Sequence, residues 1–313
     1  MMPMPRPDFP HTFIEFVRRF PNDDACWHYL VKSRWPDGFE CPEGHPGSFI
    51  ATRKLFQCSD GHQWSATSGT VMHATHMPIC TWFWAAYLMT TQTPGVSALQ
   101  LARQLDLNYE TAYMMLQKLR AGMVNPLRER LRGPVEVDET FIGGAHPGPG
   151  GRGALNKSLV VAAVEVVNRG PTDKALRSGR VRLRVIPRAT AAELLRFIRD
   201  NVTIGAAVRT DGLNSYARLD AEGYPHTIVE GSLSHGLPRV HRVFSNLKAW
   251  LLGTHHGVSH KHLQAYLNEY AFRFNRRGSP MSAFQTVLGL GANIEGPTYD
   301  ELYSGEWAHP NPS

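Results

Sequence analysis

Two carboxylates in the second half of the chain have the surroundings of a divalent-metal site. The segment PVEVDETFIGG, residues 134–144, alternates apolar and polar residues like a half-buried strand, and its polar face carries Glu136, Asp138 and Thr140. A second segment, AVRTDGLNSY, predicts a strand that ends in Asp211. Carboxylates on neighbouring strands can share Mg²⁺ or Mn²⁺, which prefer oxygen ligands. A solvent-facing strand and a simple Asp-Gly turn would give the same patterns.

Four residues nearer the N-terminus have the types and spacing of a structural zinc site. Cys41 and His45 form one C-x3-H pair, and Cys58 and His62 form a second pair after a gap of twelve residues. Zinc accepts thiolate and imidazole ligands in a tetrahedral arrangement, and so short a segment has too little core to fold without such a staple. The two pairs therefore predict a zinc ribbon. The alternative is that both histidines lie at the surface and both cysteines are simply buried.

The elements that must position the carboxylates alternate between strands and helices. We predict strands at 134–142, 158–167, 180–186, 206–210 and 226–230, and helices at 190–201, 212–219, 238–252 and 259–275. Three strands in succession, followed by helix, strand and helix, indicate an α/β domain whose first strands form an antiparallel meander. The glycine-rich segment GGAHPGPGGRG between the first two strands predicts a mobile loop near a site.

The N-terminal part is predicted to be helical on both sides of the Cys/His segment. Residues 11–34 predict two short helices, with Asn22 and Asp23 as candidate N-caps. Residues 95–122 predict two further helices joined by a tight turn, capped by Ser97 and Asn108. This pattern is that of a DNA-binding helix-turn-helix, although a plain helical hairpin would look the same.

Composition narrows the class of protein. The 313 residues are 42% hydrophobic and carry 33 Lys and Arg against 27 Asp and Glu, a formal net charge of +6. This excess favours a polyanionic partner. The sequence has no apolar run long enough to span a membrane and no signal peptide, and its four cysteines are too few for a disulfide scaffold. We therefore expect a cytoplasmic protein without a membrane partner.

Several motifs resemble one family, the DDE-type transposases of bacterial insertion sequences in the ISXO-two-like group with an N-terminal zinc ribbon. They are RWPDGFECP, SATSGTVM, VEVDETFIGG, VRTDGLNSY and HRVFSNLKAWLLGTHHGVSHKHLQAYLNEYAFRFNRR, and the resemblance covers about residues 12–290. It implies an α/β catalytic domain of the ribonuclease-H-like fold, two catalytic Mg²⁺ or Mn²⁺ ions, and the cutting and joining of transposon ends. Asp138 and Asp211 match the first two catalytic acids.

The third catalytic position departs from the family pattern. Relatives carry Glu or Asn seven residues before the lysine of SNLK, whereas this chain has His241 seven residues before Lys248. Residues seven apart share one face of a helix, so both side chains can point toward the acids and the DNA. An imidazole ligand suits Mn²⁺ better than Mg²⁺. Asn246 is a second candidate, but it faces elsewhere on the helix.

The zinc ribbon also departs from its relatives, which commonly use two C-x2-C knuckles. We keep Zn²⁺ as the structural metal, held by Cys41, His45, Cys58 and His62. The candidate phosphate contacts are basic residues of the two helical regions, namely Lys118, Arg120, Lys248 and Arg276.

These observations give a domain plan and a function. We expect an N-terminal helical segment at 1–36, a zinc ribbon at 37–75, a helix-turn-helix region at 76–128, a ribonuclease-H-like domain at 129–290 and a C-terminal tail at 291–313. The expected function is an insertion-sequence transposase that binds element ends and target DNA and acts as a homo-oligomer. The alternatives are a DNA-binding regulator derived from a transposase, for which an altered third position would be harmless, and a structure-selective nuclease.

Overall fold

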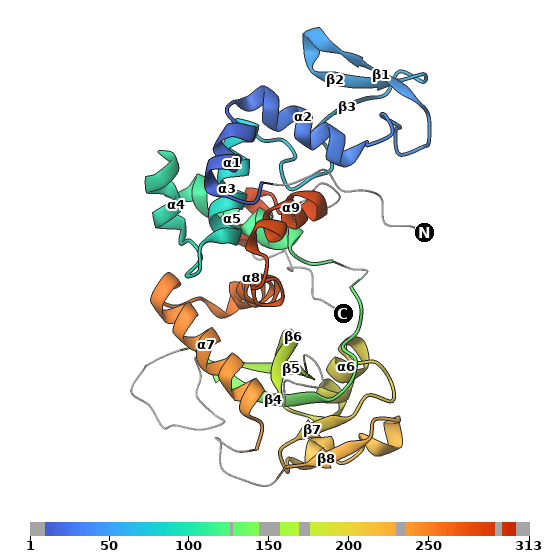
Figure 1. The fold of residues 1–313 in the computed structure, drawn as a ribbon, viewed down its shortest axis with the longest axis vertical. Helices are drawn as coiled ribbons and strands as arrows, with labels where there is room; N and C mark the ends of the chain where they lie inside the picture. The colour runs from blue at the N-terminus through green and yellow to red at the C-terminus, as the bar shows by residue number, and fades with distance from the viewer. Residues whose placement is uncertain are drawn as a thin grey trace. The chain divides into compact units, whose positions relative to one another are not determined.

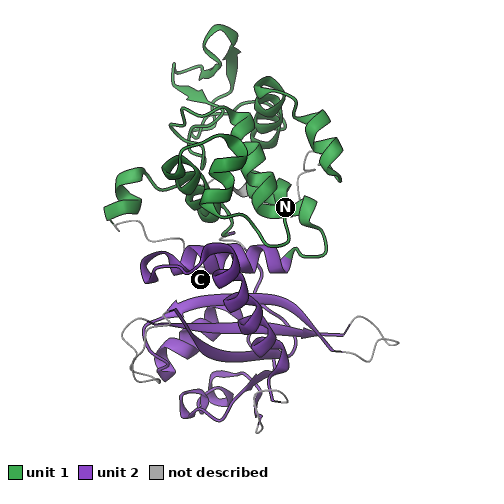
Figure 2. Cartoon of the chain, turned by 90° about the vertical axis from the view of Figure 1, so that its left-hand side faces the viewer, with its two compact units in different colours: residues 1–124, 276–307 green, residues 125–275, 308–313 purple. Residues whose placement is uncertain are grey.

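The structure is a computed structural model that describes residues 10–125, 128–143, 157–168, 176–229, 236–291 and 296–304. The chain forms two compact units (Figure 2). Unit 1 contains residues 1–124 and 276–307, and unit 2 contains residues 125–275 and 308–313. No helix in the described ranges has both the length and the apolar character needed to cross a membrane. The predicted glycine-rich loop lies outside the described residues, apart from Gly143.

Unit 2 is built on one mixed sheet of five strands (Figure 1). Its strands are β4 (Val135–Ile142), β5 (Ser158–Val167), β6 (Arg177–Ile186), β7 (Val208–Thr210) and β8 (His226–Ile228), in the order β6-β5-β4-β7-β8. The first three strands form the predicted antiparallel meander, and β7 and β8 add to the other side of β4 as parallel strands. The central strand β4 therefore has a meander on one side and parallel strands on the other.

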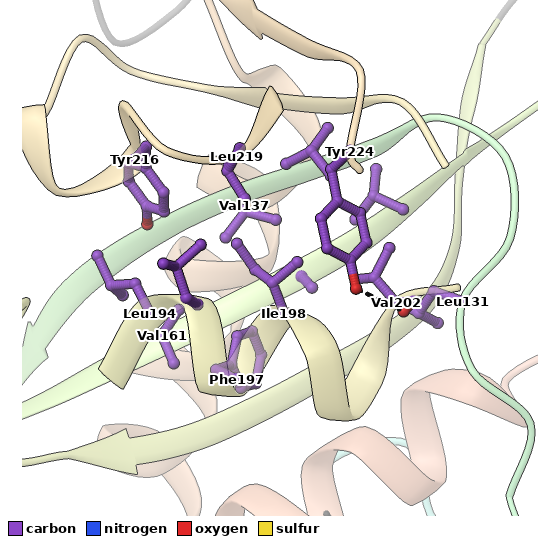
Figure 3. Close-up of a cluster of buried hydrophobic side chains, with 14 of the residues drawn as sticks. Leu131, Val137, Val161, Leu194, Phe197, Ile198, Val202, Tyr216, Leu219 and Tyr224 are labelled. Atoms are coloured by element: carbon purple, nitrogen blue, oxygen red, sulfur yellow. Dashed lines mark hydrogen bonds between the residues drawn. The ribbon is translucent and has the colours of Figure 1, made fainter. Parts of the chain in front are cut away.

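Helices cover both faces of this sheet. Helix α6 (Ala191–Asn201) packs on one face, where Phe197 and Ile198 meet Val137 and Val161 in a buried core (Figure 3). Helices α7 (Pro238–His255) and α8 (Leu263–Asn275), the latter preceded by the short 3-10 helix η4 (His260–His262), pack on the opposite face. Because side chains alternate along a strand, β4 presents Val135, Val137 and Glu139 to the α6 face and residues 136, 138 and 140 to the α7 face.

One predicted helix of unit 2 is wrong. Residues 212–219 form only the 3-10 helix η2 (Asn214–Tyr216), followed by η3 (Asp220–Glu222). The Asp211 side chain accepts a hydrogen bond from the N–H of Leu213, at 3.1 Å, which starts a local turn instead of an α-helix.

The N-terminal part of unit 1 joins a helix to a small sheet. Helix α1 (Phe13–Arg19) is followed by α2 (Asp23–Arg34), which is capped by Asn22 as predicted. Strands β1 (Gly47–Ile50), β2 (Leu55–Cys58) and β3 (Gln63–Ser65) form an antiparallel sheet in that order, with η1 (Ala51–Arg53) between the first two. Phe39 and Phe56 pack with Cys41 and Cys58, and this cluster is covered by Trp27 and Val31 of α2, by Trp35 directly after it and by Trp64 of β3.

The rest of unit 1 is helical. Helices α3 (Ile79–Thr91), α4 (Ala98–Leu105) and α5 (Tyr109–Gly122) are joined by α9 (Pro280–Gly291) and α10 (Tyr299–Ser304) from the end of the chain. The side chains of Ser97 and Asn108 cap α4 and α5, as predicted, by accepting the N–H groups of Gln100 and Thr111. Residues 276–290 were expected to belong to the catalytic domain, whereas in the structure α9 packs against α3 in unit 1.

Candidate functional site

The two predicted acids lie on neighbouring strands of the unit 2 sheet. Asp138 is on β4, and Asp211 directly follows β7. The parallel register pairs Glu136 with Arg209, and its continuation by two residues places Asp211 beside Asp138. Two carboxylates that are far apart in the sequence therefore lie side by side on the sheet.

The two carboxylates differ in their surroundings. Asp138 is buried, with 9% of its surface exposed, whereas Asp211 is exposed. Burial raises the pKa of the Asp138 carboxyl to about 6; the backbone N–H of Glu139 opposes this rise, and the negative charge of Asp211 adds to it. That N–H lies 2.8 Å from Asp138 Oδ1. A buried carboxylate held near a second one is strongly favoured to bind a cation, because a cation compensates for both lost water and like-charge repulsion.

Helix α7 brings the third predicted residue to the same face of β4. The Nδ1 atom of His241 lies 3.6 Å from Oδ2 of Asp138. Seven residues further along, Lys248 donates a hydrogen bond from Nζ to Oγ1 of Thr140, at 2.8 Å. Both side chains therefore reach β4 from one face of α7. Asn246 is exposed.

The donor set fits a divalent cation. Two carboxylates and an imidazole offer the oxygen and nitrogen atoms that Mn²⁺ accepts, and Mg²⁺ accepts the oxygens. Among the described residues, however, Asp138, Asp211 and His241 do not form a group whose ligand atoms all lie within 4.8 Å of one another. Asp138 is the central member of the set, since His241 lies 3.6 Å from its carboxylate and Asp211 follows on the neighbouring strand.

A second metal-binding arrangement is found in unit 1. The ligand atoms of Cys41, His45 and Cys58 all lie within 4.8 Å of one another. A tetrahedral zinc ion with bonds of about 2.3 Å to sulfur would hold two thiolates about 3.8 Å apart, so this group fits zinc after little movement. His62, the fourth predicted ligand, is not in the group; its ring instead lies against Trp64, with 5.7 Å between centroids.

The two Cys/His turns have the same backbone geometry. In the first, Cys41 N–H donates to the carbonyl of His45, and Gly44 N–H donates to the carbonyl of Cys41. In the second turn, Cys58, His62 and Gly61 make the same pair of bonds. Both glycines have positive φ, 82° and 81°, which other residues adopt at a cost. The repeated turn presents the two cysteines alike, as a zinc ribbon requires.

The predicted DNA contacts are only partly accessible. Lys118 is half-buried on α5 and donates to the carbonyl of His73, at 3.3 Å, and Arg276 is also half-buried. Lys248 is exposed beside Thr140. The prediction that Arg120 contacts a DNA phosphate does not hold, because its side chain is wholly buried in unit 1. Its position on the inward face of α5, three residues after Gln117, which is also buried, explains the difference.

Sequence reasoning missed three residues near the two sites. The first is Lys157, which lies near Lys248. The pKa of Lys248 is lowered mainly by burial and also by the positive charge of Lys157. Asp60 Oδ2 lies 3.3 Å from Nδ1 of His45, the position of a carboxylate that orients a metal-binding histidine. Arg239 forms an ion pair with Glu136. The position of Glu136 on the same face of β4 as Asp138 could have indicated that it needs a basic partner.

Comparison with known proteins gives two family matches. Residues 130–275 match the ISXO2-like transposase domain, and residues 21–63 match the transposase zinc-ribbon domain. A protein of Halobacterium salinarum, described as an uncharacterized protein in transposable element ISH50, is 26% identical in an alignment 303 residues long that covers 87% of this chain and 98% of that relative. The first match contains Asp138, Asp211 and His241, and the second includes helix α2 together with all four Cys/His residues.

Proposed function

The chain belongs to the DDE-type insertion-sequence transposases that carry a zinc ribbon, and from this premise we propose that it binds the ends of its element and catalyses metal-dependent DNA cleavage and strand transfer. The observation that carries the proposal is the meeting of Asp138, Asp211 and His241 on one face of the unit 2 sheet. These residues come from two neighbouring strands and a helix that are far apart in the sequence.

The fold supports this proposal. The meander β4-β5-β6, extended on the other side of β4 by parallel strands and covered by helices on both faces, agrees with the ribonuclease-H-like fold that the family resemblance implies. In such a sheet the central strand and its parallel neighbour present their side chains at one place, where a substrate can approach.

We assign Asp138, Asp211 and His241 as ligands of the catalytic Mg²⁺ or Mn²⁺. Two such ions, when bound, activate the attacking oxygen and stabilise the leaving oxygen of a phosphodiester. Lys248, held at Thr140 beside the acids, would supply positive charge to a bound DNA phosphate. Lys157 adds to this positive charge.

Unit 1 supplies the proposed DNA-binding part. Helices α4 and α5 form a helix-turn-helix whose second helix begins with exposed residues, and the zinc ribbon is stabilised by Zn²⁺ at the Cys41, His45 and Cys58 group. Because two element ends must be joined in one complex, we propose that the chain acts as a homo-oligomer on DNA.

The test is to change each acid and measure DNA binding and chemistry separately. We expect Asp138→Ala and Asp211→Ala to abolish cleavage and strand transfer on element-end DNA in Mn²⁺ while end binding stays intact. Glu222→Ala removes a carboxylate of unit 2 that pairs with Arg199 instead of a metal, and it should cleave like the wild type. Wild-type cleavage rates in either acid variant would refute the assignment.

The regulator alternative has its own support, because the three candidate ligands do not converge to 4.8 Å in the described structure. It predicts that the wild-type protein binds element ends with high affinity and does not cleave them in Mg²⁺ or Mn²⁺. The same experiment therefore decides between the two functions.

A further inference from the structure

We propose that Glu136 is a positioning residue that fixes the beginning of α7 on β4 and thereby holds His241 at Asp138. The proposal rests on the function proposed above, and it assigns a role to a carboxylate that matches no catalytic position. Glu136 is wholly buried on β4, two residues before Asp138 and on the same face of the strand.

The Glu136 carboxylate is fully engaged by the first turn of α7. Its Oε2 atom accepts hydrogen bonds from the backbone N–H groups of Arg239 and Val240, at 2.8 and 3.1 Å. Its Oε1 atom accepts a further bond from Nη1 of the Arg239 side chain, at 2.9 Å. One buried side chain of the sheet therefore binds both the backbone and a side chain of the helix.

The beginning of α7 needs such a partner. The first N–H groups of a helix have no acceptor within the helix, and the N-cap residue here, Leu237, provides no side-chain hydrogen bond. Pro238 at the first position has no N–H, so the next two N–H groups remain, and these are the two that Glu136 accepts. The negative carboxylate also lies at the positive end of the helix dipole. Glu136 is thus the cap of α7, supplied by a distant strand.

The consequence for the site follows from the spacing of contacts along both elements. Glu136 meets Arg239, Asp138 lies beside His241, and Thr140 meets Lys248. Arg239 and Lys248 are about 13 Å apart along a helix, and Glu136 and Thr140 are about 14 Å apart along a strand. The helix and the strand therefore run side by side, with an anchor on each side of the His241–Asp138 contact.

The two anchors differ in strength. Lys248 makes one hydrogen bond from an exposed position, whereas Glu136 makes three bonds in a buried place. Buried charge-assisted bonds are the stronger kind. His241 lies in the turn that Glu136 holds, so release of that turn would let the imidazole rotate away from Asp138.

A buried Glu–Arg pair elsewhere in unit 2 gives a matched control. Glu165 of β5 is also buried and accepts hydrogen bonds from the backbone N–H and the guanidinium of Arg180. It pairs in register with Val135, whose side chain lies on the α6 face, so it is on the opposite face of the sheet from Asp138. Loss of Glu165 removes a comparable pair without touching α7.

The experiment compares Mn²⁺ affinity with folding stability in the full-length, zinc-loaded protein. We expect Glu136→Ala and Glu165→Ala both to unfold at lower urea concentration. Only the Glu136 variant should raise the Kd for Mn²⁺, on the order of tenfold, as seen when a residue that orients a metal ligand is lost. Glu136→Gln keeps one acceptor oxygen and serves if the alanine variant does not fold; it should raise the Kd in the same direction.

Two results would separate failure of this inference from failure of the proposed function. Asp138→Ala should abolish specific Mn²⁺ binding, and if it does not, the metal site itself is wrong. If Asp138→Ala loses the ion while both Glu136 variants keep a Kd within about twofold of the wild type, the metal site stands and Glu136 is not its positioning residue. A raised Kd in Glu165→Ala equal to that of Glu136→Ala would also overturn the inference.

Discussion

Asp138 combines burial with negative charge, an arrangement that is costly without a cation. Its folded pKa of about 6 lies above the ordinary value of 3.8, so the folded protein binds this proton more tightly than the unfolded chain does. The free energy of unfolding therefore falls as pH rises from about 4 to about 6 and stays low above that. The cost at neutral pH is up to about 3 kcal/mol, because one pKa unit corresponds to about 1.4 kcal/mol. Such a cost is typical of a functional residue.

We therefore predict that Asp138→Asn stabilises the protein in buffer without Mg²⁺ or Mn²⁺. The gain in the free energy of unfolding should approach about 3 kcal/mol at about pH 7 and shrink toward about pH 5, where the wild-type carboxyl is protonated. Urea unfolding at the two pH values measures it. Glu222→Gln, on an exposed ion pair, should show no such gain, and a destabilised Asp138→Asn variant would contradict the prediction.

His241 should set the preference between metals. Its imidazole is a softer ligand than the Glu carboxylate or the Asn amide oxygen of the family pattern, so the wild type should work better with Mn²⁺ than with Mg²⁺. In His241→Glu, the ratio of the cleavage rate in Mg²⁺ to that in Mn²⁺ should rise on the order of tenfold, about 1.4 kcal/mol of the barrier. Asn246→Glu adds the same group on an exposed part of α7 and should leave the ratio unchanged. An equal rise in both variants would contradict a special role for His241, and a rise in the Asn246 variant alone would make Asn246 the better candidate.

At the level of single residues, the sequence identified Asp138 and His241 by their match to family motifs but could not assign Glu136 or Arg120. Glu136 is explained only by the beginning of α7, about one hundred residues later. Arg120 belongs to a basic cluster in the sequence, yet the rotation of α5 turns its side chain inward. Charge clustering gives the number of basic residues in a segment, and only packing determines which of them face solvent.

At the level of elements, the long strands were predictable because residues buried on both faces leave an apolar run, as in SLVVAAVEVV. The failure at 212–219 has a local cause, the hydrogen bond from Leu213 to the Asp211 side chain. That turn also places Asp211 directly after β7. Asp211, whose side chain starts this turn in place of a helix, is therefore also a residue of the candidate metal site.

The zinc ribbon is an element whose stability should depend on its metal. Cys41→Ser together with Cys58→Ser should remove the zinc, about one ion per chain, and lower the protection of β1, β2 and β3 from amide hydrogen exchange. The structure further predicts that His45→Ala weakens zinc binding more than His62→Ala, since only His45 lies in the ligand group. Zinc content after dialysis measures both effects. Zinc retained in the double cysteine variant would rule the site out.

At the level of the whole molecule, the chain leaves unit 1 near residue 124 and returns to it at residue 276. The returning helix α9 carries Phe284, which is wholly buried. Its ring lies 5.4 Å from that of Phe16 and 6.0 Å from that of Phe83. The core of the N-terminal unit is thus completed by a residue from the C-terminal part of the chain. A sequence pattern shows that Phe284 is on the apolar face of a helix, but not which unit that face covers.

This arrangement predicts that unit 1, the proposed DNA-binding part, depends on the C-terminal part of the chain. Phe284→Ala should destabilise unit 1 by about 3–5 kcal/mol, the usual cost of removing a buried phenylalanine ring, and lower the affinity for element-end DNA. Its Mn²⁺ affinity should be unchanged, because the acids belong to unit 2. Phe197→Ala, at a buried position between α6 and the sheet, is the matched control and should instead weaken Mn²⁺ binding while end binding persists. Unfolding followed by hydrogen exchange would locate each loss, and a loss of protection confined to unit 2 in Phe284→Ala would show that α9 stabilises unit 2 instead.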